Sequence, residues 1–249
     1  MTSASRPFSC LTWNLHRCCG NDGVVDTERT LAVLQAEVWQ PGADALVLTE
    51  ADADGPPYPG LLDLGQLEAA TGLRSVHTSP AHRWSDASHG FLGTIVLVHP
   101  DCGLDHTAVL DLPGKVHRGA VVVEMIRDGR VCRLIGAHLS LSQGLRWAQM
   151  RVIAQYIERR PEMPTILAGD LNEWRPWLGL AFSHKGFGLS FKGPAKGTFP
   201  VRRPVLPLDR VLTAGAARVL STKILDGPGI RLVSDHRPLR AEVVLTGKG

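Results

Sequence analysis

The stretch "RGAVVVEMIRDGRVCRLIGAHLS", residues 118–140, decides how the strands of this protein are arranged. Two apolar runs flank Asp128-Gly129, a dipeptide typical of a tight turn, so they predict an antiparallel hairpin. Residues 144–161 have helical spacing, and the short apolar run 164–170 then predicts another strand. The residues expected to face the core from this helix are Leu145, Ala148, Val152, Ile153 and Ile157. Since a hairpin is followed by a strand–helix–strand unit, we expect mixed sheets covered by helices.

Predicted strands and helices also occur on both sides of this stretch. The predicted strands cover residues 8–14, 43–50, 92–100, 208–213 and 237–245. The predicted helices cover residues 27–41, with Leu31, Leu34 and Val38 on one face, and a short segment near 64–72. Residues 51–90 are rich in Gly, Pro and Asp and predict a long, loop-heavy insert of the kind that often builds binding surfaces. With no repeat and no low-complexity linker, residues 1–249 are expected to form a single α/β domain.

Composition narrows the class of protein. Apolar residues make up 44% of the chain and charged residues 20%, an ordinary globular balance. The net charge of +3 permits an anionic substrate, although no basic stripe typical of a dedicated nucleic-acid binder is present. No apolar run is long enough to cross a bilayer, so no transmembrane segment is expected. The N-terminus "MTSASRPFSC" lacks an apolar signal core, which predicts a cytoplasmic protein.

The five cysteines show no spacing typical of a zinc site or of a disulfide framework. Their odd number, without an export signal, predicts reduced thiols. Cys18 and Cys19 are adjacent and are expected to be small or buried side chains beside a turn at Gly20.

Polar residues recur where apolar strands end. Asn14, Glu50 and Asp170 each end a predicted strand, while His138 follows one and Asp209 opens another. A single strand-terminal Asp is usually a turn former or helix cap, but several together indicate a site held by a rigid sheet. Carboxylate and amide oxygens suit Mg²⁺ or Mn²⁺, whereas zinc favours His and Cys.

The segment "SDHRPL", residues 234–239, places Asp235 beside His236. Neighbouring side chains on an extended strand point to opposite faces, so these two share one pocket only if the backbone turns between them or if they lie at a strand end. Taken alone, the pair is typical of a solvent-facing loop.

Six motifs occur together in an order that resembles the endonuclease/exonuclease/phosphatase superfamily. They are "LTWNLH" (11–16), "LTE" (48–50), "AHLSL" with a following Arg and Gln (137–149), "AGDLNEW" (168–174), "TFP" with "LDRV" (198–211) and "SDHRPL" (234–239). The resemblance runs from about Leu11 to Val244 and is strongest to small bacterial metal-dependent hydrolases. It implies a four-layer α/β sandwich, in which two mixed β-sheets pack face to face and helices cover their outer faces.

The resemblance also implies roles for single residues. Glu50 is similar to the principal Mg²⁺ ligand of the family, with Asn14 and Asp235 near the metal. Asp170 is similar to the residue that orients or deprotonates the attacking water. The remaining matches are Asn172 and His138, which would contact phosphate oxygens, and His236 with its carboxylate partner Asp209, which would stabilise the pentacovalent transition state.

Other residues have more than one interpretation. Arg118 would touch substrate phosphate or form a surface salt bridge. Trp174 would stack on a base, line a lipid groove, or simply pack in the core or be partly exposed. Arg146 and Gln149 lie three apart on one helix face, and the resemblance places them near the His138 loop as structural hydrogen-bonding residues.

Three functions compete. The first is an Mg²⁺-dependent phosphodiesterase, nuclease-like, that hydrolyses its substrate by metal-assisted in-line attack of water; its binding to nucleic acid would be sensitive to salt. The second is a hydrolase of phospholipid head groups or small phosphomonoesters, like a sphingomyelinase or phosphatase. The third is a non-catalytic binding module on the same fold, which the complete polar set argues against. The "LTEAD" stretch (48–52) lacks the Lys that apurinic-site nucleases of the superfamily usually carry soon after the metal Glu.

Overall fold

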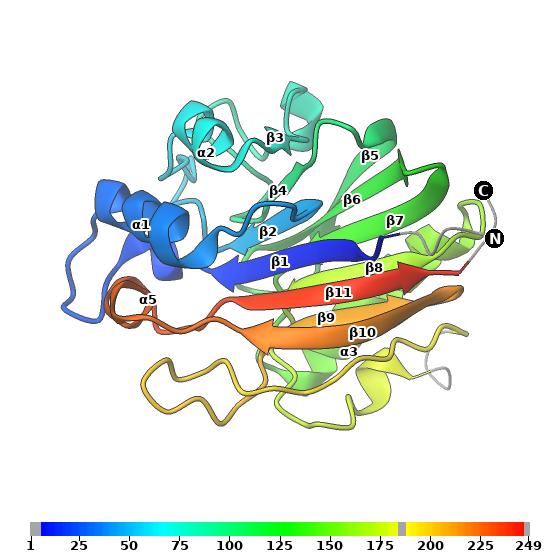
Figure 1. Ribbon diagram of the computed structural model, residues 1–249. Helices are drawn as coiled ribbons and strands as arrows, with labels where there is room; N and C mark the ends of the chain where they lie inside the picture. Colours follow the sequence, from blue (N-terminus) through cyan, green and yellow to red (C-terminus); the bar gives the residue numbers. More distant parts are fainter. Residues whose placement is uncertain (1–5, 184–187, 247–249) are drawn as a thin grey trace.

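The protein is built from two β-sheets packed face to face, as a computed structural model covering residues 6–183 and 188–246 shows (Figure 1). The first sheet has six strands in the order β10-β11-β1-β2-β4-β3. The strands are β1 (Phe8–Asn14), β2 (Ala45–Thr49), β3 (Arg74–Ser75), β4 (Ile95–Val98), β10 (Ala217–Ile224) and β11 (Leu239–Leu245). Only β1 and β2 are parallel, and the other neighbours are antiparallel, so this sheet is mixed.

The second sheet has five strands in the order β5-β6-β7-β8-β9. The strands are β5 (Gly103–Leu112), β6 (Arg118–Arg127), β7 (Arg130–Ala137), β8 (Thr165–Asp170) and β9 (Asp209–Ala214). The β6–β7 hairpin turns at Asp128-Gly129, where both residues have positive φ, as predicted. The helix α3 (Gln143–Glu158) then returns the chain, so β8 lies parallel to β7.

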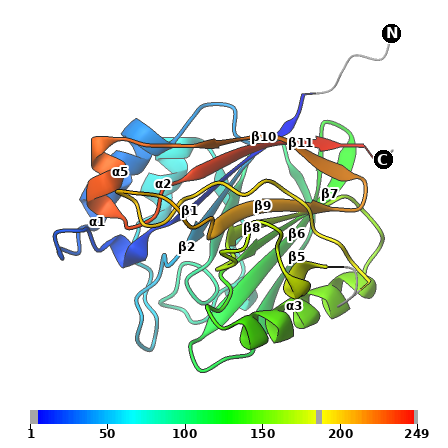
Figure 2. The same ribbon diagram turned by 90° about the horizontal axis from the view of Figure 1, so that it is seen from below.

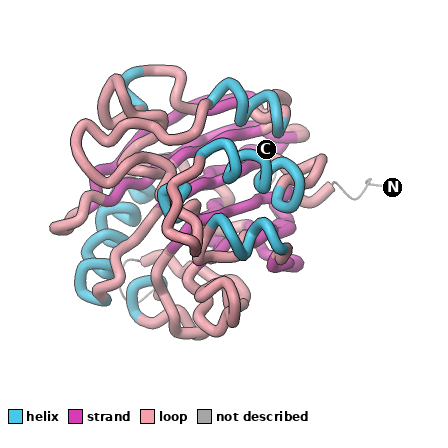
Figure 3. The backbone as a smooth tube through the Cα atoms, turned by 90° about the vertical axis from the view of Figure 1, so that its left-hand side faces the viewer, coloured by secondary structure: helices cyan, strands magenta, loops and turns pink. Residues whose placement is uncertain are grey.

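Helices form the two outer layers. The helices α1 (Thr27–Val33), α2 (Leu64–Thr71) and α5 (Pro228–Val233) lie on the outer side of the first sheet, and α3 lies on the outer side of the second (Figures 2 and 3). Short helical turns lie at His16–Cys18, Leu34–Val38, Pro80–His82 and Leu180–Phe182. The predicted four-layer α/β sandwich with two mixed sheets is therefore confirmed. Among the described residues, none of the helices has the length and apolar character needed to cross a membrane.

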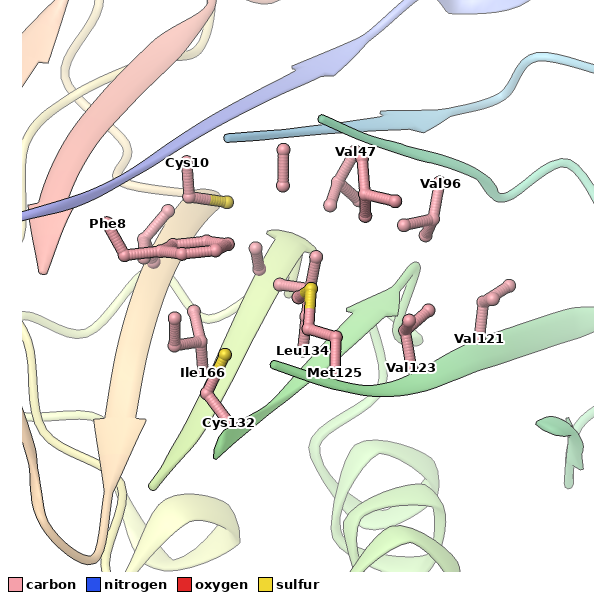
Figure 4. Packing of buried hydrophobic residues seen from close by; sticks show 14 of the residues in the cluster. Phe8, Cys10, Val47, Val96, Val121, Val123, Met125, Cys132, Leu134 and Ile166 are labelled. Atoms are coloured by element: carbon pink, nitrogen blue, oxygen red, sulfur yellow. The ribbon is translucent and has the colours of Figure 1, made fainter. Parts of the chain in front are cut away.

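The main core lies between the sheets. Phe8, Cys10 and Val47 from the first sheet face Val123 and Leu134 from the second (Figure 4). This explains why the central strands consist of nearly continuous apolar runs: each is covered on both faces. All five cysteines are free, and four are buried; burial raises the pKa of the Cys18 thiol to about 11. Of the adjacent pair, Cys18 is buried, as predicted, and Cys19 is partly exposed.

Several predictions about elements were incomplete or wrong. The helix predicted for 27–41 is α-helical only to Val33 and then widens into a π turn, in which the N–H of Trp39 donates to the carbonyl of Leu34. Leu145 was predicted to face the core but is exposed, while the neighbouring Arg146 is buried. The strands β3, β5 and β10 were not predicted, because they are edge strands and carry no long apolar run.

Candidate active site

The predicted site residues gather where the strands of both sheets end. Asn14 is the last residue of β1, and Glu50 directly follows β2, its parallel neighbour. Asp170 is the last residue of β8 and pairs in register with Asp209, the first residue of β9. The Nδ2 atom of Asn14 donates to Oδ2 of Asp170 at 2.9 Å, so one hydrogen bond joins the two sheets at this edge.

Asp170 lies at the centre of the site and is buried. Its Oδ1 atom accepts the backbone N–H of Asn172 at 3.1 Å. Its Oδ2 atom lies 3.4 Å from Nε2 of His138 and 3.9 Å from Nε2 of His236. Burial, together with the nearby carboxylate of Asp209, raises the pKa of Asp170 to about 6. The side chain can therefore hold or release a proton near neutral pH.

His236 is held by a buried carboxylate. Its Nδ1 atom lies 2.7 Å from Oδ2 of Asp209, which is fully buried. Burial alone would lower the pKa of His236, but the charge and hydrogen bond of Asp209 outweigh it and raise that pKa to about 10. The ring is therefore a cation at neutral pH, and it directs an Nε2–H toward Asp170 and Asp235.

The turn at Asp235 and His236 has the geometry that "SDHRPL" requires for a shared pocket. The segment precedes β11, and the Oγ atom of Ser234 accepts the backbone N–H of His236 while donating to the carbonyl of Asn14. Oδ1 of Asp235 and Nε2 of His236 lie 3.9 Å apart. Both side chains therefore reach the same site.

His138 is neutral and its tautomer is defined. Nη1 of Arg118 lies 3.0 Å from Nδ1 of His138, and a guanidinium can only donate. The proton of the neutral ring is therefore on Nε2, which faces Asp170 and, at 3.9 Å, Oε1 of Glu50. Burial and the charge of Arg118 hold the pKa of His138 well below its usual value. Arg118 forms no ion pair among the described residues, so the surface salt bridge is not observed, and its contact with substrate phosphate stays a prediction.

Asn172 and Glu50 both occupy left-handed backbone conformations, with φ of 51° and 52°. Such strain in non-glycine residues is concentrated at functional sites. The Nδ2 atom of Asn172 donates one proton to the carbonyl of Leu139 at 2.8 Å, which leaves its second proton for a ligand. Oε2 of Glu50 lies 2.9 Å from Nη1 of Arg17, a contact that motif spacing did not predict.

The donor set fits a hard divalent cation. Oδ1 of Asp235 is buried and accepts no hydrogen bond from the described residues, as expected for an oxygen reserved for a cation. Asp170, Asp209 and His236 also offer ligand atoms within 4.8 Å of one another. However, a protonated His236 cannot ligate a metal, so the oxygens of Glu50 and Asp235 are the better donors. Glu50 lies beside the charge of Arg17, and Asp235 lies beside that of His236.

The helix α3 supports the His138 loop, as predicted for Arg146 and Gln149. Oε1 of Gln149 accepts the N–H of Ser140 at 2.7 Å, and Nη1 of Arg146 donates to the carbonyl of Ser140 at 2.8 Å. Trp174 is instead 54% exposed, so the core-packing interpretation of this residue is wrong.

A cavity of about 370 Å³ opens beside Glu50 and His138. Its other walls include Arg17 from the turn after β1, Tyr58 from the insert after β2 and His117 from the loop before β6. These three residues were not predicted to belong to the site. No motif marks them, because loops far apart in the sequence bring them together.

Comparisons with known proteins identify the family to which the chain belongs. The model of the Endonuclease/Exonuclease/phosphatase family matches residues 11–236, and the chain belongs to this family. It is 29% identical over 214 residues to the uncharacterized protein YbhP of Escherichia coli K12, a match that covers 74% of this chain and 83% of YbhP.

Solved structures share the fold. The endonuclease/exonuclease/phosphatase from Beutenbergia cavernae superposes with a TM-score of 0.66 at 22% identity, over 98% of this chain and 73% of that one. TDP2 of D. rerio, in complex with a single-strand DNA product, superposes with a TM-score of 0.67 at 15% identity, over 96% of this chain and 100% of that one.

Proposed function

We propose that the protein hydrolyses phosphodiester bonds with the help of Mg²⁺, for which Mn²⁺ would substitute. The observation that carries the proposal is the position of Asp170 between a neutral His138 and a cationic His236. The raised pKa of Asp170 suits a general base, since a base works best when its pKa lies near the working pH.

In this proposal Asp170 orients the attacking water and takes its proton. His236 and the free N–H of Asn172 donate to the oxygens on which negative charge accumulates, and Asp209 keeps the ring of His236 oriented and charged. His138 donates from Nε2 to a phosphate oxygen, with Arg118 behind it. Glu50 and Asp235, with Asn14 nearby, would hold the cation, which when bound supplies charge neutralisation at the phosphate.

Nucleic acid is the first substrate class to test. Lys115 and Arg118 line the cavity beside Glu50 and form no ion pair among the described residues, so both can bind phosphate oxygens. Arg17 lines it too but pairs with Glu50 and Asp54. TDP2 of D. rerio, which shares the fold, was solved with a single-strand DNA product, and this supports testing nucleic acid first. A role for the exposed Trp174 in stacking on such a substrate is part of the same proposal.

One observation favours phospholipid head groups as an alternative substrate class. An apolar hollow of about 560 Å³ adjoins the cavity, and Val116, Leu141 and Leu145 line it. These side chains are aliphatic and are 56%, 73% and 36% exposed. An acyl chain would cover them.

The test is hydrolysis of bis(p-nitrophenyl) phosphate, plasmid DNA and single-stranded DNA in Mg²⁺, by wild type and by Asp170→Asn purified in parallel. We expect wild type to cleave and Asp170→Asn to lose roughly a factor of a thousand in kcat, because the general base is removed. Equal cleavage by both proteins would identify a contaminant. No cleavage of any diester by either protein would overturn the proposal.

A further inference from the structure

The cavity beside Glu50 has two chemically different ends. At its inner end lie Glu50, His138 and Arg118, which belong to the proposed catalytic site. At its outer end lie Tyr58 and His117, whose rings meet edge to face at a centroid distance of 5.5 Å and an angle of 69°. Lys115 lines the cavity as well, is exposed and has no ion-pair partner among the described residues, and the carboxylates of Asp52 and Asp54 also belong to the lining.

The outer end is built rigidly. Tyr58 has a left-handed backbone with φ of 56°, and Ser88, which is fully buried, donates from Oγ to its carbonyl at 2.7 Å. Trp84 braces both rings, with its centroid 6.1 Å from that of Tyr58 and 5.7 Å from that of His117. Of these three rings, those of Tyr58 and His117 line the cavity, so they can contact a ligand that enters it.

We infer that this cavity holds one unpaired nucleotide next to the scissile phosphate, with its base against Tyr58 and His117 and its outer phosphate near Lys115. The inference rests on the proposed function and names the form of its substrate. Aromatic side chains beside a basic groove are the usual means of binding single strands, since every base has a face that can stack.

The size of the cavity decides between single and double strands. At about 370 Å³, it lies at the lower end of the usual range for small-molecule pockets, roughly 300–1,000 Å³. It has room for one base and its sugar but not for a base pair. A duplex would have to unpair its end before a nucleotide could enter, so single strands should be preferred.

Binding to the Asp170→Asn variant tests this inference apart from catalysis. The probes are a fluorescein-labelled pentathymidylate, the same chain with abasic spacers, and a blunt duplex. We expect the pentathymidylate to bind roughly five- to a hundredfold more tightly than the abasic chain, the range for loss of base stacking on an aromatic side chain. We expect the duplex to bind more weakly than the single strand.

Variants of the aromatic wall sharpen the test. Adding Tyr58→Ala should reduce pentathymidylate binding to the level of the abasic chain, while Tyr58→Phe should retain it because the ring remains. Trp177→Ala is the matched control, since Trp177 is 73% exposed and does not line this cavity. It should bind as the parent does. The far-ultraviolet circular dichroism of each variant shows whether it folds.

Equal affinity for thymidylate and abasic chains, or tighter binding of the duplex, would overturn the inference. A protein that binds anionic phospholipid vesicles but no oligonucleotides would also overturn it, if Leu141→Asp abolishes the vesicle binding. The apolar hollow would then be the substrate subsite. If wild type fails to hydrolyse bis(p-nitrophenyl) phosphate while Tyr58-dependent base binding is present, the proposed function fails and the nucleotide pocket stands.

Discussion

Oδ2 of Asp209 lies 2.7 Å from Nδ1 of His236, although the two residues are 27 positions apart on different elements. The carboxylate is buried, and its other oxygen accepts no hydrogen bond among the described residues. A buried charge of this kind is stable only beside a partner of opposite charge. The pair therefore links the orientation of the ring to its protonation.

Replacing Asp209 with Asn should lower kcat for bis(p-nitrophenyl) phosphate by roughly a hundredfold or more, because His236 would lose its charge as well as its orientation. His236→Ala should have a similar effect, and the double variant should be little worse than either single one, since the two residues act as a unit. Strictly additive losses in the double variant would show that they act separately.

Mg²⁺ should stabilise the folded protein through Glu50. A ligand at 100 times its Kd adds about 2.7 kcal/mol to the free energy of unfolding, which corresponds to several degrees in Tm for a chain of this length. We expect this increase in wild type and its loss in Glu50→Gln, while EDTA abolishes hydrolysis. Glu242→Gln is the control, because Glu242 pairs with Ser9, at the opposite end of β1 from Asn14. An unchanged Mg²⁺ response in Glu50→Gln would exclude this carboxylate as a ligand.

His77 should make the fold sensitive to acid. It is 3% exposed; its Nδ1 atom lies 2.7 Å from the carbonyl of His82, and its Nε2 atom accepts the N–H of Val96 at 3.1 Å. Burial lowers its pKa from 6.5 to about 4. The unfolded chain then binds more protons between these values, so stability falls as the pH falls through this window. The loss due to His77 should be roughly 2 kcal/mol at pH 5 relative to pH 8.

Urea denaturation at pH 8 and pH 5 measures this effect in wild type and in His77→Asn, which does not titrate. The variant should be less stable at pH 8, because the N–H of Val96 loses its acceptor, and should lose less stability on acidification. The same pH dependence in both proteins would mean that His77 is not the responsible group.

Gly169, next to Asp170, should not tolerate alanine. Its φ is +138°, and a Cβ atom there would lie 1.9 Å from the carbonyl oxygen of Ala137 on the neighbouring strand. We expect Gly169→Ala to lower the free energy of unfolding by about 2–4 kcal/mol. Gly42→Ala separates backbone strain from the steric clash, since Gly42 has a φ of +87° but open space around it. It should lower the free energy of unfolding by about 1 kcal/mol, through strain alone. Equal losses in the two variants would show that the contact with Ala137 is relieved.

Much of the fold could be predicted because the central strands are covered on both faces. Runs such as those of β2 and β6 must be apolar to be buried in this way, and they can therefore be recognised without a structure. The edge strands β5 and β10 carry no such run, because charged and polar residues interrupt their apolar ones. The exposure of Leu145 also escaped prediction, because the helical face that packs inward carries Arg146 and Gln149, whose polar groups bond to the His138 loop.

Local motifs in the sequence were enough to identify Asn14, Glu50 and Asp170 at the ends of strands and His236 just before one. What surrounds these residues depends on the packing of the whole chain. The contact of Arg17 with Glu50, the bond from Arg118 to His138 and the pairing of Tyr58 with His117 each join loops distant in the chain. Such contacts depend on how two sheets and their loops pack, and local spacing carries no signal for them.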